Sequence, residues 1–226
     1  MNYIAHVRKL NNDQWAEPQL LETHLHETAK LAAEFASEFD SREWGYALGI
    51  SHDTGKATLE WQKYFHIKSG YDEEASSESP GRVEHSGPGA KLAEDIFGKT
   101  GRFLSYSIAG HHAGLPDWIG SQAALAFRLQ NSNTKDVNEE IKSLLHGLCP
   151  NNPPWIFNNT GLDISLWIRM LFSCLIDADR LNTENYMNPE QSKESQGYSG
   201  IKKLHRRFNE FMETKTKKPQ IPHHSS

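Results

Sequence analysis

Apolar residues recur at helical spacing along most of this chain, and that periodicity constrains the fold more than any other feature of the sequence. Between Leu20 and Phe39 they recur every three or four residues, which predicts a helix with one buried stripe. No segment shows the alternating pattern and hairpin turns of paired strands. The sequence therefore predicts an all-α fold. Further helices are expected at residues 42–52, 57–67, 88–97, 102–112, 121–130, 135–147, 162–180 and 200–213.

The composition narrows the class of protein. The chain has 226 residues with 24 Lys+Arg and 29 Asp+Glu, so its net charge is −5 and nucleic acid would have to be held by a local patch, a metal or a partner. Only two cysteines occur, Cys149 and Cys174, which excludes a disulfide scaffold and a multi-cysteine zinc finger. No apolar run approaches the ~18–20 residues of a membrane span. We therefore expect a cytoplasmic protein with no membrane partner.

Histidine is over-represented, with twelve in the chain, and five of the histidines fall in an ordered series with two aspartates along the expected helices. Imidazole nitrogens and carboxylate oxygens are the ligands that borderline divalent metals accept. Five histidines and two aspartates would suffice for two metals, and a carboxylate can bridge them through its two oxygens. Two cations ~3.5–4 Å apart can activate a water and hold both reacting oxygens of a phosphoester. The set consists of His24, His52, Asp53, His85, His111, His112 and Asp179.

Each member of this set alone has a simpler interpretation. A His–Asp dipeptide such as His52-Asp53 commonly ends a helix. Adjacent histidines in a helix, such as His111 and His112, point ~100° apart, so one would face the core and one the solvent. His24 lies in line with the apolar stripe of its helix, which favours a hydrogen-bonded core histidine. The ordered set as a whole, rather than any single residue, indicates a metal site.

The order of these residues resembles the HD phosphohydrolase superfamily. The segments GISHDTGKATLEWQKYF (49–65), HSGPGAKLAEDIFG (85–98), IAGHHAGLPDW (108–118) and LFSCLIDADRLNTENY (171–186) are similar to the HD nuclease domain of the CRISPR-associated helicase–nuclease of type I systems. The segments MNYIAHVR (1–8) and LLETHLHETAKLAAEFA (20–36) fit the same family. The resemblance covers the chain from residue 1 to about residue 212.

The resemblance implies an HD-domain helical bundle with one or two divalent metal ions (Mn, Ni, Co, Fe, Mg or Zn) between its helices. Asp177, ~200° around the helix from Asp179, competes with it for the role of last ligand. Ser51 stands where the family usually carries an apolar residue, which bears on packing. The implied ligands are His24, His52, Asp53 and Asp179 for one metal, and His85, His111 and His112 for the second, with Asp53 between the two.

Three residues are expected to take part in catalysis, namely His52, Asp53 and Lys56. Lys56 closely follows the His–Asp pair and could neutralise charge that develops on a phosphate. A solvated lysine at a helix start is the alternative interpretation of Lys56. Gly49 to Lys56 does not match a phosphate-binding loop, because Ile50 and Ala57 stand where that motif needs Gly and Ser or Thr, so no ATP site is predicted.

The expected function is metal-dependent hydrolysis of phosphodiester bonds in DNA, preferentially single-stranded, in type I CRISPR interference. The implied partners are single-stranded DNA, a helicase domain or subunit, and the CRISPR RNA-guided surveillance complex. One alternative is a small-molecule phosphohydrolase of the HD family, a nucleotidase or cyclic-nucleotide phosphodiesterase, which needs an enclosed pocket. Another is a non-catalytic docking module with a relic site. The residues alone do not distinguish DNA from RNA as the substrate.

The domain is expected to span residues 1–213, followed by a linker or disordered tail at 214–226. Residues 68–84 hold little to bury and are expected to form a mobile surface loop. The basic run from Lys202 to Arg207 could track a nucleic-acid backbone, although a solvated helix face is the commoner explanation. Trp118 follows the His–His pair and could stack on a single-stranded base at the mouth of the site, although core packing is commoner for tryptophan.

Overall fold

The structure is a computed structural model that describes residues 2–71, 81–148, 150, 161–194 and 201–216. Helices dominate these residues, so the predicted all-α fold is confirmed. The helical elements are α1 (Leu21–Ser37), α2 (Arg42–Ser51), the 3-10 turn η1 (Thr54–Lys56), α3 (Leu59–Ser69), α4 (Ser86–Phe97), α5 (Gly101–Gly110), α6 (Leu125–Asn131), α7 (Glu139–Ser143), α8 (Gly161–Met187), α9 (Pro189–Glu194) and α10 (Ile201–Thr216).

The elements differ from the sequence-based expectation in a few places. Strands β1 (Ile4–His6) and β2 (Gln19–Leu20) form a small antiparallel pair that was not predicted. Strands of three and two residues are too short to show an alternating pattern. The helix expected at 135–147 is reduced to α7, and α9 was not predicted. Most of the loop expected at 68–84 and of the tail at 214–226 lies outside the described residues.

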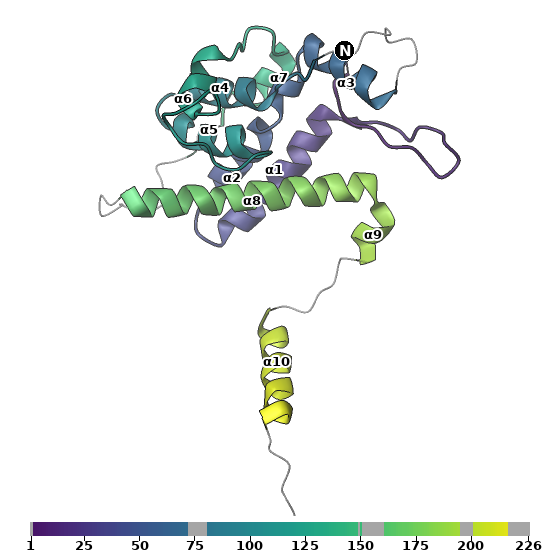
Figure 1. Cartoon of the computed structure of the whole chain (residues 1–226), viewed down its shortest axis with the longest axis vertical. Coiled ribbons are helices and arrows are strands. Elements are labelled where there is room, and N and C mark those ends of the chain that lie inside the picture. Colours follow the sequence, from purple (N-terminus) through teal and green to yellow (C-terminus); the bar gives the residue numbers. More distant parts are fainter. Residues whose placement is uncertain (1, 72–80, 149, 151–160, 195–200, 217–226) are drawn as a thin grey trace, which may run out of the picture.

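Helix α8 runs across the bundle, and α1 and α2 pack against it (Figure 1). Two glycines of α2 let α1 and α2 cross closely: a Cβ on Gly45 would overlap the carbonyl oxygen of Ala32, and one on Gly49 would overlap the backbone of Ala29. Burial of apolar side chains stabilises this crossing. It also brings His24 of α1 beside the end of α2, where the candidate site begins.

The larger part of the core lies where α2, α5 and α8 meet. The rings of Trp44 and Trp167 form an edge-to-face pair with centroids 4.6 Å apart. The indole N–H of Trp167 donates to the hydroxyl of Ser41 at 2.9 Å, so the buried polar atom of this ring is satisfied. A smaller core group joins α1, α2 and α7 through Leu25, Ile50 and Ile141. These contacts fix α1, α2, α5 and α8, the elements that carry most of the candidate ligands.

Helix α10 stands apart from the bundle in Figure 1. Every side chain that the structure describes on it, from Lys202 to Lys215, is exposed. Among the described residues, no helix is both long enough and apolar enough to span a lipid bilayer.

Candidate metal centre

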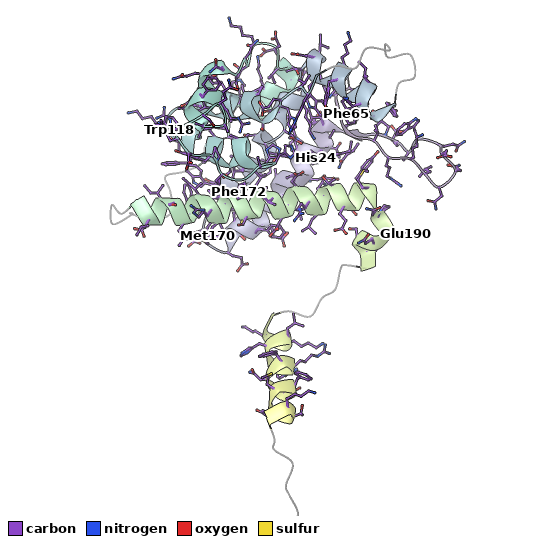
Figure 2. The ribbon with its side chains drawn as sticks, viewed as in Figure 1. His24, Phe65, Trp118, Met170, Phe172 and Glu190 are labelled. Atoms are coloured by element: carbon purple, nitrogen blue, oxygen red, sulfur yellow. The ribbon has the colours of Figure 1, made fainter. Side chains whose placement is uncertain are left out.

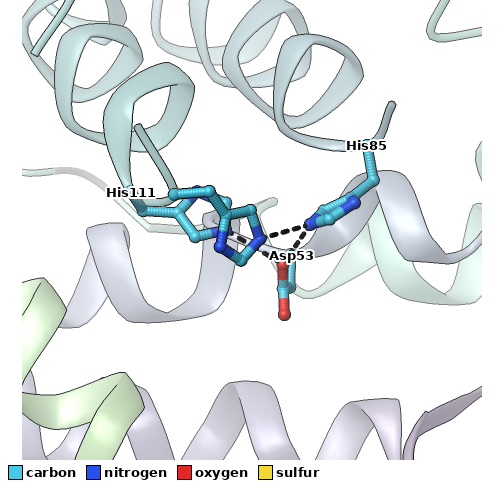
Figure 3. A group of neighbouring side chains, drawn as sticks. Asp53, His85 and His111 are labelled. Atoms are coloured by element: carbon cyan, nitrogen blue, oxygen red, sulfur yellow. Dashed lines mark hydrogen bonds and ion pairs between the residues drawn. The ribbon is translucent and has the colours of Figure 1, made fainter. Parts of the chain in front are cut away.

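The seven histidine and aspartate residues singled out in the sequence lie together in the structure. They come from five places in the fold, and each lies on a helix or at a helix end. His24 lies on α1, His52 and Asp53 between α2 and η1, His85 at the start of α4, His111 and His112 after α5, and Asp179 on α8. Figure 3 shows His85 and His111 converging on Asp53.

The first group of donors surrounds one oxygen of Asp53. Oδ2 of Asp53 lies 3.3 Å from Nε2 of His24 and 3.4 Å from Nε2 of His52. Oδ1 of Asp179 lies 3.4 Å and 3.6 Å from the same two nitrogens. Ligands about 2.0–2.2 Å from one metal lie about 3–3.5 Å from one another. The donor atoms of His24, His52 and Asp53 lie close enough together to hold one cation, and Asp179 approaches this group from the side of the two histidines.

The second group of donors surrounds the other oxygen of Asp53. Oδ1 lies 3.1 Å from Nε2 of His85 and 3.3 Å from Nε2 of His111, and Nε2 of His112 lies 2.9 Å from that of His85. Oδ1 of Asp53 and Nε2 of His111 are buried and have no hydrogen-bond partner among the described residues. Buried polar atoms without partners are rare, and a divalent cation would satisfy both. The donors of this group therefore also fit a metal.

Three of the histidines have their second ring nitrogen engaged, which directs the first toward the site. Nδ1 of His52 lies 2.8 Å from the carbonyl oxygen of Gly49, and Nδ1 of His111 lies 2.6 Å from that of Ile108. Nδ1 of His24 lies 2.7 Å from Oδ1 of Asn182. Because each acceptor takes the Nδ1–H, the Nε2 lone pair stays available, an arrangement typical of metal-binding histidines.

Asn182 was missed by the sequence analysis. Its side-chain oxygen also accepts from Nε2 of Gln19 at 2.9 Å, and its amide nitrogen donates to Oε2 of Glu27 at 2.6 Å. These partners fix the amide orientation and so the tautomer of His24. The sequence did offer one indication of this role: Asn182 lies three residues after Asp179 and therefore near it on the same helix face.

Arg128 of α6 joins the segments that carry the second group of donors. Its Nη2 donates to Oε1 of Glu84 at 2.6 Å and to Oγ of Ser86 at 2.7 Å, on either side of His85. Its Nη1 donates to the carbonyl oxygen of Ala109, just before the two histidines that follow α5. One guanidinium thus holds the start of α4 against the end of α5. Nothing in the sequence pattern indicates this role.

Gly55 explains why the His–Asp pair is followed by a glycine two positions later. A Cβ at this position would overlap the carbonyl oxygen of His85. The turn η1 therefore packs directly under the segment that carries His85. This close approach places Asp53, at the start of η1, within reach of His85.

Lys56 is buried, so the interpretation of a solvated lysine is wrong. Its Nζ lies 2.6 Å from Oδ2 of Asp53 and 5.3 Å from the centroid of the Trp61 ring.

Ser51 is also fully buried, and its hydroxyl donates to the carbonyl oxygen of Ala47 at 2.7 Å. Packing therefore accepts a serine where the family usually has an apolar residue.

The charges within the cluster shift several pKa values. Burial lowers the pKa of His52, but the carboxylates of Asp53 and Asp179 outweigh burial and raise it to about 10. Burial raises the pKa of Asp53, but the cations Lys56 and His52 outweigh burial and hold it well below its usual range. Burial and the neighbouring His111 lower the pKa of His112 to about 4. Without a metal, the first group of donors thus carries a proton on His52, while His112 is neutral.

Two further candidates from the sequence are placed by the structure. Asp177 is exposed and forms no ion pair within the described residues, whereas Asp179 faces His24 and His52. Trp118 does not line the groove of about 800 Å³ that contains His85 and His112. The proposed position of Trp118 at the mouth of the metal site is therefore wrong.

The helical bundle and its buried histidine–aspartate cluster define a class of protein, the HD-type metal-dependent hydrolases. The family model described as "Cas3, HD domain" matches residues 12–176, which is more than half of the chain. The chain belongs to this family of CRISPR-associated proteins, and the resemblance seen in its motifs is confirmed. The match includes every member of the cluster except Asp179, which lies three residues beyond its end. No curated protein matches the chain.

Proposed function

We propose that this protein is a nuclease that hydrolyses phosphodiester bonds of DNA, preferentially single-stranded, in type I CRISPR interference in the cytoplasm. Its proposed partners are a helicase domain or subunit and the RNA-guided surveillance complex. We assign the domain to residues 1–213 and a linker or tail to 214–226. The observation that carries the enzymatic part is the shared carboxylate: Oδ1 and Oδ2 of Asp53 face two separate sets of histidines.

Two divalent cations are proposed, one in each donor group. His24, His52, Asp53 and Asp179 would hold the first. Asp53, His85, His111 and His112 would hold the second. Bound cations of this kind supply Lewis-acid activation of water and stabilise charge on phosphoryl oxygens.

The residues of the chain would contribute positioning and charge. Asp53 would fix the separation of the two cations, because both of its oxygens are used. Its low pKa keeps it ionised throughout the neutral range. Lys56 would offset negative charge on the phosphate, since its buried ammonium lies beside the same carboxylate.

The shape of the surface near the cluster supports a nucleic-acid substrate. His85 and His112 line one groove together with aromatic and cationic side chains of α3, α6 and the segment before α4. Unpaired bases stack on aromatic rings, and cations contact phosphates. The residues involved are Tyr64, Phe127 and Arg82.

Circular single-stranded DNA tests the proposal, because a circle has no ends and only internal cleavage opens it. The protein is incubated with this DNA and Mn²⁺, Ni²⁺, Co²⁺ or Mg²⁺, with and without chelator. We expect metal-dependent opening of the circle, and a loss of at least about 100-fold in His24→Ala. His26→Ala is the matched control, because His26 lies on α1 but contacts Tyr46 and Glu22 rather than the cluster.

Cleavage that persists in chelator, or unchanged cleavage by His24→Ala, would contradict the mechanism. Two other substrates test the alternatives. Turnover of nucleoside monophosphates without DNA cleavage would identify a small-molecule phosphohydrolase. Faster cleavage of RNA than of DNA would correct the substrate. A protein that binds no metal after reconstitution would be a docking module.

A further inference from the structure

A second groove lies between α5 and α8 and shares no lining residue with the groove at the metal centre. Its volume is about 950 Å³. The segment 115–118, which follows the two histidines after α5, closes one side of it. Aromatic and cationic side chains line this α5–α8 groove, and those used below are Lys99, Arg102, Tyr106, Trp118, Arg169 and Phe172.

The aromatic and cationic groups of the α5–α8 groove lie close together. The guanidinium carbon of Arg102 lies 4.9 Å from the centroid of the Trp118 ring, and the ring of Tyr106 lies 6.3 Å from it. Trp118 is only half-buried, so part of its ring remains open to the groove. A tryptophan that served only the core would be covered. The open part of the Trp118 ring and the guanidinium of Arg102 over that ring form a surface that a flat ligand can contact.

The α5–α8 groove is basic although the protein is acidic. Three cations line it against a single carboxylate, Asp117, which gives 3 − 1 = +2, whereas the whole chain has a net charge of −5. Arg102 is already paired with Glu94, at 2.9 Å. Lys99 and Arg169 are exposed, and neither has an ion-pair partner within the part of the chain that the structure describes. These two cations are therefore available to an anionic ligand.

The α5–α8 groove and the metal centre lie along the same face of α8. Phe172, which lines the groove, lies seven residues before Asp179. Seven residues return to the same helix face and advance about 10 Å. Figure 2 shows Trp118 and Phe172 on the same side of His24. A chain molecule in this groove would therefore need to extend about 10 Å along this face of α8 to reach Asp179.

We propose that the α5–α8 groove binds the single strand a few nucleotides away from the phosphate that is cleaved, with bases on Trp118 and phosphates at Lys99 and Arg169. This inference rests on the proposed nuclease function and gives it a substrate path. Stacking requires unpaired bases and tolerates any sequence, because every base has a π-face. Half-buried rings beside unpaired cations suit a strand that alternates bases with phosphates better than an acidic peptide.

Binding without metal tests this path independently of hydrolysis. The full chain is titrated into a labelled oligothymidine of about 15 nucleotides in the presence of chelator, and fluorescence anisotropy gives the affinity at several salt concentrations. In Lys99→Ala/Arg169→Ala we expect the slope of log affinity against log salt to fall by about 1.4, because each phosphate contact in a single strand contributes about 0.7. The charge-matched control is Lys30→Ala/Lys135→Ala, which removes two exposed lysines outside both grooves and should leave the slope unchanged.

Trp118 variants separate stacking from folding. Trp118→Ala should weaken binding by roughly 5- to 100-fold, and Trp118→Phe, which keeps a ring, should retain most of it. An abasic strand of the same length should bind wild type and Trp118→Ala equally. Binding that is unaffected in both the Trp118→Ala and the double variant would overturn the proposal. So would an acidic peptide that binds as tightly as the oligonucleotide and depends on the same residues, because the groove would then be a protein-docking surface.

The two proposals fail separately. If the oligonucleotide binds as predicted but no circle is opened with any metal, the groove stands and the nuclease function is wrong. If circles are opened but the groove variants bind and cleave as wild type does, the function stands and the α5–α8 path is wrong.

Discussion

Nζ of Lys56 lies 2.6 Å from Oδ2 of Asp53, the same oxygen that faces His24 and His52. A cation of the protein thus sits beside the carboxylate oxygen that we assign to the first metal. The ammonium would repel that metal, and it would also attract a phosphate. Affinity for metal and rate of cleavage should therefore respond to Lys56 in opposite directions.

Lys56→Met removes the charge and keeps an apolar stem against Trp61. We expect affinity for the first metal to rise at least about tenfold, because like charges a few ångströms apart repel strongly in a buried site. The cleavage rate at saturating metal should fall about 100-fold, as for loss of one group that stabilises charge in the transition state. Isothermal titration with Mn²⁺ and single-turnover cleavage measure the two quantities. Equal metal affinity in the wild type and Lys56→Met would show that Lys56 does not influence the first metal.

Asp179 should be needed for one metal only. Asp179→Asn is expected to weaken the first metal by about 10- to 100-fold or more while the second binds as in wild type, because Asp179 contacts only His24 and His52 within the cluster. Metal titration resolves the two events. Asp177→Asn, on the exposed side of α8, is the matched control and should bind both metals normally. Loss of both metals in Asp179→Asn would mean that the two groups are not separate.

Arg128 should affect the affinity for the second metal. Arg128→Ala releases the start of α4 from the end of α5, and we expect affinity for the second metal to fall about 10- to 100-fold with the first unchanged. Arg128→Lys should not restore it, because an ammonium cannot reproduce the fork that reaches Glu84, Ser86 and Ala109. Arg42→Ala, which removes an exposed arginine at the start of α2, serves as the control. An unchanged second affinity in Arg128→Ala would show that the clamp does not position these ligands.

The metal-free protein should lose stability as the pH rises. The pKa of His52 is about 10 in the folded protein, against 6.5 for a free histidine. A folded-state pKa above the unfolded value means that the folded form holds the proton more tightly, so the contribution is complete below pH 6.5 and is lost as the pH rises toward 10. Urea unfolding in chelator should therefore give a free energy that decreases from pH 7 to pH 10. In His52→Asn this part of the decrease should be absent, and an identical slope in both proteins would contradict the assignment.

The histidine–aspartate series could be predicted from the sequence because its members stand on helices or at helix ends in a recognisable order. Their division around the two oxygens of Asp53 was inferred from the resemblance, and the structure supplies the distances. Asn182 and Arg128 escaped prediction because their partners are distant along the chain: Asn182 contacts His24 158 residues away, and Arg128 contacts Glu84 44 residues away. The spacing of Asn182 from Asp179 places both on one face of a helix, but a single sequence does not show that Asn182 contacts His24 or that Arg128 contacts Glu84.

Lys56 and Trp118 show that the surroundings of a side chain are also hard to predict from the sequence. A lysine at the start of a turn is usually solvated, and only the packing of Trp61 and Asp53 around Lys56 shows that this one is buried. Trp118 was proposed to stack on a base at the mouth of the metal site because it is near His111 and His112 in sequence, but it lines the other groove. The chain reverses direction after α5 and carries Trp118 to the side of Arg102.

The central claim is that one aspartate holds two metals, and the number of metal ions per chain in Asp53→Asn tests it most directly. Wild type and variant are dialysed against Mn²⁺ and analysed by native mass spectrometry, with circular dichroism to show that both are folded. We predict two ions per chain in wild type and fewer than one in Asp53→Asn, because each donor group loses the carboxylate that it shares. Two ions per chain in Asp53→Asn would contradict the account.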